Sequence, residues 1–179
     1  MRDEGKIGAI GISAVRADVL KRALPADIVC VQNAYSLPDR SQEATLELCE
    51  QRGIAWVPFF PLGSAFAGVP SVADDPVVRE VADGIGVTPA QIGLAWLLAH
   101  SPKALLIAGT RSIAHLEQNV AAGEITLATD ALARLDAVGG PRAVLPSRDR
   151  GQARRYRPRP PRRSRQGIRP SGRDGKAGR

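Results

Sequence analysis

The fold is decided by residues 28–57, which read IVCVQNAYSLPDRSQEATLELCEQRGIAWV. The stretch opens with the β-branched run Ile28–Val31, continues through a polar segment that ends near Arg52, and closes with the apolar run Ile54–Val57. Gly53, placed directly after the polar segment, is a typical helix terminator. A buried strand, a helix and a second buried strand in this order predict a parallel strand–helix–strand unit.

The same alternation extends outward in both directions. Toward the N-terminus, Ile7–Ile12 predicts a strand, and helical spacing follows at residues 17–24. Toward the C-terminus, a fourth strand is predicted at Leu105–Ala108. The remaining expected helices are 76–85, 92–100, 113–122 and 130–138, and the expected helix caps are Ser41, Thr88, Ser112 and Thr129. Apolar strands that alternate with helices predict an α/β protein with a parallel sheet, whose ligands bind at the carboxyl ends of the strands.

Charge divides the chain into two parts. Lys and Arg number 12 in residues 1–146 and 13 in residues 147–179, against 16 and 2 for Asp and Glu, which leaves net charges of −4 and +11. We expect residues 1–146 to form the one domain that 179 residues allow, and the Arg/Pro/Gly-rich residues 147–179 to be a disordered tail. Such a tail is more often an inert solvated segment than a nucleic-acid-binding arm, which stays as the alternative function.

Several classes of protein are not indicated by the sequence. No apolar run reaches the roughly 18 residues of a membrane span, and the N-terminus has no apolar signal-peptide stretch, so we expect a cytoplasmic protein. The two cysteines, Cys30 and Cys49, lack the spacing of a zinc site or a disulfide framework, and we expect both to be buried thiols.

Polar residues and glycines follow each predicted strand. With the aromatic and apolar residues that accompany them, they are Ser13, Gln32–Asn33, Phe59–Phe60 with Leu62–Ser64, and Gly109–Ser112. Glycine lets a backbone approach a phosphate closely, and the helix that begins after Ser112 offers free N–H groups to an anion. Together these residues predict a site for a phosphorylated ligand, although the chain has neither GxGxxG after a strand nor a P-loop. Taken singly, Ser13 and Ser112 are more often helix caps, Gly63 a turn residue and Phe59 a core residue.

Five segments, in the order in which they occur, resemble the C-terminal half of the aldo-keto reductases. They read GKIGAIGIS, VQNAYSLPDR, IAWVPFFPLG, TPAQIGLAWLLAHSP and IAGTRSIAHLEQN, within a match that extends from about Arg2 to Val138. The resemblance implies strands five to eight of a (β/α)8 (TIM) barrel and a protein that reduces aldehydes and ketones with NADPH or, less often, NADH. It therefore implies NADP(H) as the cofactor, with NAD(H) as the alternative.

The resemblance also assigns residues to the cofactor. Ser13 and Gln32 correspond to family residues that hold the nicotinamide carboxamide, with Ala14 where the family has Asn, and Phe59 corresponds to the aromatic residue that stacks on the nicotinamide. Leu62, Gly63 and Ser64 correspond to the pyrophosphate loop. Around the adenosine 2′-phosphate the corresponding residues are Gly109, Thr110, Arg111, His115, Gln118 and Asn119. Many members carry basic residues at positions 109 and 115, so here Arg111 or His115 would supply the charge.

The resemblance assigns no catalytic residue to this chain. In the family, the Tyr proton donor, the Lys, the Asp and the His lie on the first four strands and their loops, and none of them maps onto this sequence. We therefore expect a partial barrel that is inactive alone. Its open edges predict pairing with a separate N-terminal half barrel or with a second copy of the chain. The carbonyl substrate is a small molecule, and no metal or membrane is implied.

Overall fold

The computed structural model describes residues 1–63 and 70–138. The chain separates into one unit of Met1–Leu145 and another of Pro146–Arg179, and everything described here belongs to the first unit. The disorder predicted for residues 147–179 concerns a segment that lies outside the described residues.

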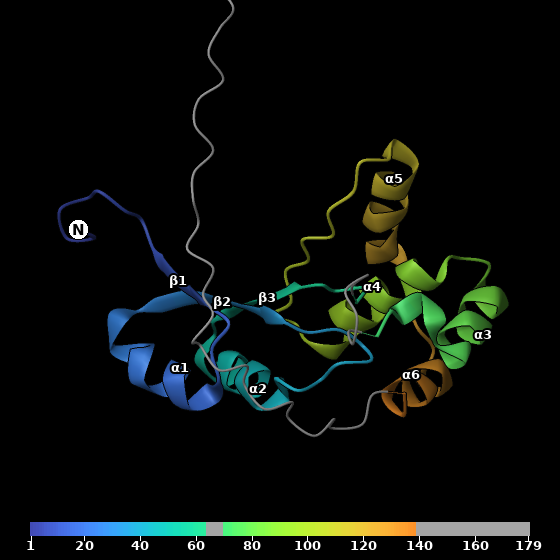
Figure 1. The fold of residues 1–179 in the computed structure, drawn as a ribbon, viewed down its shortest axis with the longest axis horizontal. Coiled ribbons are helices and arrows are strands. Elements are labelled where there is room, and N and C mark those ends of the chain that lie inside the picture. Colours follow the sequence, from blue (N-terminus) through green and yellow to red (C-terminus); the bar gives the residue numbers. More distant parts are fainter. Residues whose placement is uncertain (64–69, 139–179) are drawn as a thin grey trace, which may run out of the picture. The chain divides into compact units, whose positions relative to one another are not determined.

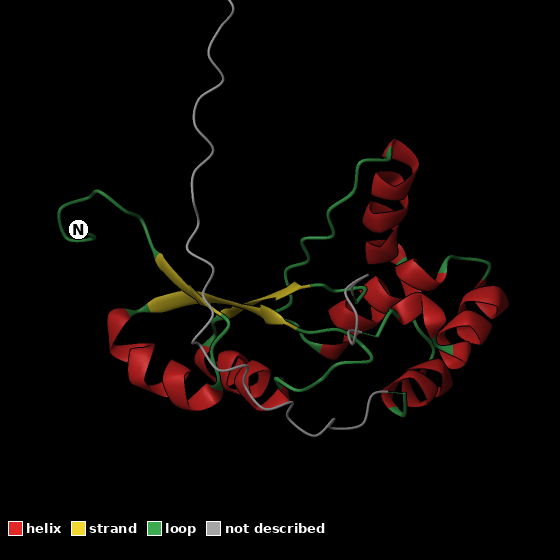
Figure 2. Cartoon of the chain, in the orientation of Figure 1, coloured by secondary structure: helices red, strands yellow, loops and turns green. Residues whose placement is uncertain are grey.

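Three parallel strands form the sheet (Figures 1 and 2), in the order β1-β2-β3. They are β1 (Ile10–Ser13), β2 (Ile28–Ala34) and β3 (Ala55–Phe59). The register pairs Ile12 with Val31 and Val31 with Trp56. Helices α1 (Ala17–Ala23) and α2 (Glu43–Arg52) are the crossovers, and α2 ends at Gly53, whose φ is 68°. The predicted α/β class and parallel sheet are confirmed.

The predicted fourth strand, Leu105–Ala108, is wrong as a regular strand. The structure shows only an isolated parallel bridge between Ala104 and Trp56. Trp56 donates its backbone N–H to Lys103 O at 2.8 Å, and Leu105 N donates to Trp56 O at 2.8 Å. The next ladder bond on this edge of β3 would need an N–H from Pro58, which has none. Residues 105–108 are apolar enough for a strand, but Pro58 on the neighbouring β3 lacks the N–H that would donate the next hydrogen bond of the ladder.

The second half of the described chain is helical. Its helices are α3 (Pro76–Ile85), α4 (Pro89–His100), α5 (Ile113–Ala121) and α6 (Thr129–Asp136), with short 3-10 turns at Leu24–Ala26, Val72–Asp74 and Ala122–Glu124. Thr88 and Gln91 form the predicted capping box, and Ser112 caps α5. The predicted caps Ser41 and Thr129 are wrong, because α2 and α6 begin after Gln42 and Ala128 without a side-chain cap.

One face of the sheet is buried and the other is more open. Along β2 and β3 the buried residues Val31, Asn33, Trp56 and Pro58 alternate with less buried neighbours. The buried side belongs to the core, which also contains Leu46 and other residues of α2. Figure 1 shows α1 and α2 together on this side of the sheet. The alternation of strand side chains between two faces explains the pattern.

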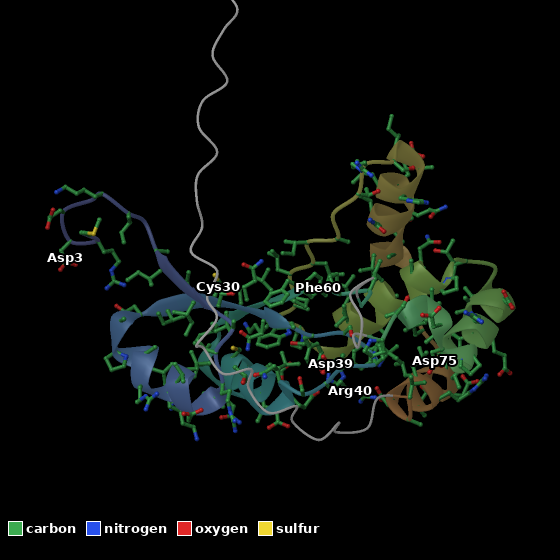
Figure 3. The ribbon with its side chains drawn as sticks, viewed as in Figure 1. Asp3, Cys30, Asp39, Arg40, Phe60 and Asp75 are labelled. Atoms are coloured by element: carbon green, nitrogen blue, oxygen red, sulfur yellow. The ribbon has the colours of Figure 1, made fainter. Side chains whose placement is uncertain are left out.

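An aromatic and polar network connects α2, α4 and α6. Tyr35 is 1% exposed and donates its hydroxyl to Glu43 Oε2 at 2.5 Å, while His100 Nε2 lies 2.8 Å from Glu43 Oε1. Trp96 stacks on His100, with ring centroids 4.4 Å apart, and donates its Nε1–H to Asp136 Oδ1 at 2.9 Å. Arg40, labelled in Figure 3, lies over the Trp96 ring and donates to Asp136 O at the same end of α6.

This network shifts two pKa values in opposite directions. Burial, together with the hydrogen bond to Glu43, raises the pKa of Tyr35. For Glu43, burial alone would raise the pKa, but the hydrogen bonds with His100 and Tyr35 outweigh it and lower the pKa from its usual 4.5. An ionised Glu43 therefore stabilises the folded protein above the usual glutamate pKa, and this contribution is lost as the pH falls through the folded value.

Glu43→Gln is expected to lower the free energy of unfolding at pH 7 by about 1 kcal/mol, because the ionised hydrogen-bond acceptor is lost. The difference from the wild type should shrink as the pH falls below the usual value of 4.5. Urea unfolding at several pH values measures it. Glu47→Gln is the matched control, since Glu47 is exposed on the same helix. A gap between Glu43→Gln and wild type that does not narrow in acid would contradict the assignment.

Cysteine, metal and membrane features add little. Burial raises the pKa of the Cys49 thiol to about 11, as predicted for a buried thiol. The prediction that Cys30 is buried is wrong, because this residue is only half-buried at the middle of β2. The described residues contain no cluster of His, Cys, Asp and Glu suited to a metal ion. Within the same residues, no single helix is long and apolar enough to cross a membrane; α3 and α4 reach that length only together, with a 95° bend between them.

Candidate functional site

The carboxyl ends of β1 and β2 bring two predicted site residues together. Ser13 and Gln32 are register partners, and the Ser13 hydroxyl donates to Gln32 O at 2.8 Å. Ser13 is exposed and Gln32 is half-buried, both on the more open face of the sheet. Phe59 ends β3 on that face, paired with Ala34, and packs edge-on against Phe60 with ring centroids 5.2 Å apart. The three residues thus lie along one edge of the sheet.

Two residues at this edge have left-handed backbone conformations. Ala14 has φ 53° directly after β1, and Phe60 has φ 55° directly after β3. Figure 3 labels Phe60 near the end of the sheet. Non-glycine residues adopt this region at a cost, and such conformations concentrate at functional sites. Ala14 is held there because its N–H donates to Gln32 O at 2.9 Å. The strand ends are therefore fixed in shape before any ligand binds.

Asn33 positions this edge, a role that the sequence reasoning missed. Its side chain is 1% exposed, accepts the N–H of Val15 at 3.0 Å and donates to Val15 O at 2.6 Å. These two bonds lock the turn that carries Ser13 and Ala14. An Asn at a core-facing strand position, next to a Gln on the open face, is the signal that could have identified it.

A second group of predicted residues surrounds a cavity of about 290 Å³. Six of the predicted positions line it: Leu62, Gly109, Thr110, His115, Gln118 and Asn119. Arg111 is exposed and is not among the lining residues, and Ser64 lies outside the described residues. The structure therefore brings together residues from the loop after β3 and from α5, which are about 50 positions apart in the sequence.

The sequence reasoning missed the remaining wall of the cavity. It consists of Ala73, Thr88, Pro89 and Ala90. The capping box of Thr88 was identified from the sequence, but only as a helix start, and the approach of this helix end to α5 is a tertiary contact that no local pattern predicts. Ala90 is small, so the start of α4 leaves room beside it for a ligand.

Hydrogen bonds hold the loop before α5 in place. The Thr110 hydroxyl accepts the N–H of Ser112 at 3.1 Å, and the Ser112 hydroxyl accepts the N–H of His115 at 3.4 Å. Asn119 donates its side-chain amide to Ala108 O at 3.3 Å. A Cβ placed on Gly109 would meet no atom within 4 Å, so the space beside this glycine is open. The described lining contains a histidine and no carboxylate, which suits an anionic ligand.

Gly63 is required by the loop itself. Its φ is 80°, and a Cβ at this position would lie 2.0 Å from Pro70 O and 2.8 Å from Ser71 Cα. Gly63 N donates to Phe60 O at 2.8 Å, and Leu62 O accepts from Val72 N at 3.1 Å. The predicted reason for this glycine, close approach of a phosphate, is therefore joined by a structural one, which is close approach of the chain's own backbone.

Comparison with known proteins gives one consistent result. The sequence model of the Aldo/keto reductase family matches residues 1–139. Similar curated proteins include pyridoxine 4-dehydrogenase of Escherichia coli, 42% identical over 139 residues, and an uncharacterized oxidoreductase of Schizosaccharomyces pombe, 39% identical over 140 residues. These matches cover 77% and 78% of this chain but 47% and 44% of the relatives. The chain thus spans about half the length of the curated relatives it matches.

Solved structures show the same likeness. A thermostable aldo-keto reductase in complex with the inhibitor epalrestat matches with a TM-score of 0.68 and 32% identity, over 77% of this chain and 51% of that one. An aldose reductase from Giardia lamblia matches with a TM-score of 0.69 over 76% of this chain and 46% of that one. The second match is 22% identical and shows the fold alone.

Proposed function

Because this chain belongs to the aldo/keto reductase family, a family of oxidoreductases that act on small-molecule carbonyl compounds with nicotinamide cofactors, we propose that it binds NAD(P)H across the two groups of residues described above. The observation that carries the proposal is the cavity, which gathers from two distant segments six residues that the family resemblance assigns to the cofactor. When bound, the cofactor supplies hydride chemistry, and the residues of this chain grip and orient it.

The strand ends receive the nicotinamide. Ser13 and Gln32 are adjacent and present hydrogen-bonding side chains on the open face, where a carboxamide can pair with them. Phe59 offers a ring at the end of β3, and aromatic faces stack well on a planar ring. Ala14 lacks the side-chain amide that the family's Asn supplies, so this end of the cofactor is held by fewer contacts.

Ala14→Asn is expected to tighten nicotinamide nucleotide binding about threefold, or about 0.7 kcal/mol, by adding one hydrogen bond. Asn also tolerates the left-handed backbone that Ala14 adopts at φ 53°. Fluorescence titration with NADPH measures the affinity. Ala14→Gly relieves the same backbone conformation without adding an amide, and it should raise stability slightly without tighter binding. Equal gains in the two variants would assign the effect to the backbone.

The cavity receives the adenosine end of the cofactor. Its volume of about 290 Å³ lies at the lower limit of ligand pockets, about 300–1,000 Å³, and therefore suits one end of a dinucleotide. Thr110, Gln118 and Asn119 line it, with His115 beside them and Arg111 next to Thr110 in the chain. These donors suit a 2′-phosphate, so we propose NADP(H) as the cofactor and keep NAD(H) as the alternative.

The chain alone is proposed to lack turnover, as a partial barrel corresponding to strands five to eight of the family's fold. Its described tyrosine, Tyr35, is 1% exposed, donates to Glu43, and has a pKa raised by burial and by that hydrogen bond, so it is not placed to give a proton to a substrate at the open face. A completed site would need residues from a partner, either a separate N-terminal half barrel or a second copy. The comparisons favour this role over nucleic-acid binding by the tail.

The cavity assignment is tested by a matched pair on one helix. Ala90 lines the cavity at the start of α4, whereas Ala99 is exposed near its end. Ala90→Phe should fill the cavity and weaken NADPH binding at least tenfold in a fluorescence titration, while Ala99→Phe should bind like the wild type. Unchanged affinity in Ala90→Phe would remove the cavity from the proposal. A carbonyl-reduction assay on the purified chain should show no turnover, and robust turnover would contradict the missing catalytic residues.

A further inference from the structure

Among residues 1–63 and 70–138, no helix covers the face of the sheet opposite α1 and α2 (Figure 1). Ser13, Gln32 and Val57 form one register row on this face, and the bridge at Ala104 adds Leu105 and Ile107 to the same side. Leu105 is 56% exposed and Ile107 43%, whereas Leu106 between them packs against the core. We call this surface the open face. Large aliphatic side chains at alternate positions are typical of a strand that faces a partner layer.

Helix α5 carries a second uncovered apolar surface. Ile113, Leu116 and Val120 are 77%, 52% and 70% exposed. Their spacing places them on one side of the helix, which we call the α5 stripe. Single exposed apolar residues are common on protein surfaces and need no explanation. Three that share one side of a helix normally face a core or another chain.

The outer edges of the sheet are also unprotected by charge. Strands β1, β2 and β3 read IGIS, IVCVQNA and AWVPF and contain no charged residue. In the described chain, β1 has a strand neighbour on one side only, and the backbone of residues 104–108 pairs with the sheet only at the bridge between Ala104 and Trp56. Uncharged edges are suited to pairing with another strand, because neither desolvated charge nor like-charge repulsion opposes it.

We propose that two copies of this chain associate through the open face and the α5 stripe, with β1 of each copy next to residues 104–108 of the other. Leu105, Ile107 and the three stripe residues would form the apolar centre of this interface, and the buried centres of homodimer interfaces are more apolar than the rest of a protein surface.

A second copy of the chain fits the open face and the α5 stripe better than the chain's own C-terminal segment does. A twofold interface must be self-complementary. Each copy carries both edges that the proposed interface pairs, β1 and residues 104–108. The chain's own residues 147–179 carry +11 with almost no large apolar residues, which suits neither an apolar face nor an uncharged edge.

This inference deepens the proposed function. It rests on that function only for the idea that the two copies together form a closed barrel. Sedimentation of the full chain tests it without any nucleotide, so a failure of NADPH binding leaves the result unaffected. Ala90→Phe, which blocks the cavity, should sediment like the wild type. The two proposals therefore fail in separate measurements.

The wild type is expected to sediment at tens of micromolar with twice the monomer mass of 19.0 kDa. Leu105→Lys on the open face and Val120→Lys on the α5 stripe should each give a 19.0 kDa monomer. Ile85→Lys is the matched control: Ile85 is 45% exposed at the end of α3, outside both surfaces, and this variant should remain dimeric. Fluorescence of the buried Trp56 and Trp96 checks that each variant is folded.

A monomeric wild type overturns the proposal and leaves the chain's own C-terminal segment or a separate polypeptide as the occupant. Folded Leu105→Lys and Val120→Lys variants that stay dimeric overturn the placement of the interface. Loss of the dimer in Ile85→Lys as well would show that added charge, and not its position, separates the copies, and would also overturn it.

Discussion

Gly63→Ala is expected to lower the free energy of unfolding by about 3 kcal/mol. A left-handed backbone at φ 80° costs a non-glycine residue about 1 kcal/mol. The new Cβ would also lie 2.0 Å from Pro70 O and 2.8 Å from Ser71 Cα, and these backbone atoms cannot rotate away as a side chain can. Overpacking of this kind typically costs about 1–3 kcal/mol. Urea unfolding followed by tryptophan fluorescence measures the loss.

Gly53→Ala separates the two causes of this loss. Gly53 has a similar φ of 68°, but a Cβ there would meet nothing within 4 Å. Its replacement should therefore cost about 1 kcal/mol, the backbone contribution alone. If the two alanine variants lose the same stability, the close approach of residues 70 and 71 is not what requires glycine at position 63.

Gly109→Lys is expected to shift nucleotide preference toward NADPH over NADH by about tenfold, or about 1.4 kcal/mol. Gly109 lines the cavity, and the space beside it is open, so a lysine side chain fits without overpacking. The described lining contains no carboxylate that would neutralise the new cation. NADPH carries a 2′-phosphate that a cation attracts, and NADH does not. Parallel titrations with both nucleotides measure the ratio.

A lysine elsewhere on the chain is the control for this shift. Gly123 also has no atom within 4 Å of an added Cβ, and it lies outside the cavity lining. Gly123→Lys adds the same charge and should leave the nucleotide ratio unchanged. The gain in Gly109→Lys should also decrease as salt increases, because screening weakens the attraction. An equal shift in both variants would mean that net charge, and not the cavity, selects NADPH.

The parallel sheet and most helices could be predicted because their signals are local. The β-branched run at Ile28, the glycine at position 53 and the capping box at Thr88 each determine a strand or a helix end within a few residues. The fourth strand could not be predicted in the same way. Residues 105–108 have the right composition, but the lost ladder bond belongs to Pro58, almost 50 residues earlier on the neighbouring strand.

The candidate site was predictable to the extent that it follows strand ends and family motifs. Ser13 and Gln32 meet because parallel strands end at one edge, and Gly109, Thr110 and Asn119 meet because they belong to one loop and the helix after it. The sequence marks Asn33 as a polar residue at a core-facing strand position, but neither its bonds to Val15 nor the place of Ala90 in the cavity wall could be predicted. They depend on which side chain reaches the turn after β1 and which helix end closes the cavity, and both are properties of three-dimensional packing.

The absent N–H of Pro58 has a mechanical consequence for ligand binding. Beyond Leu105, the chain that carries Gly109 and Thr110 has no regular pairing with β3, and Asn119 of α5 holds it through Ala108 O. The wall of the cavity is thus anchored to the helix, while Ser13 and Gln32 are anchored to the sheet. A dinucleotide that contacted both groups would therefore be held at one end by the sheet and at the other by residues attached to α5.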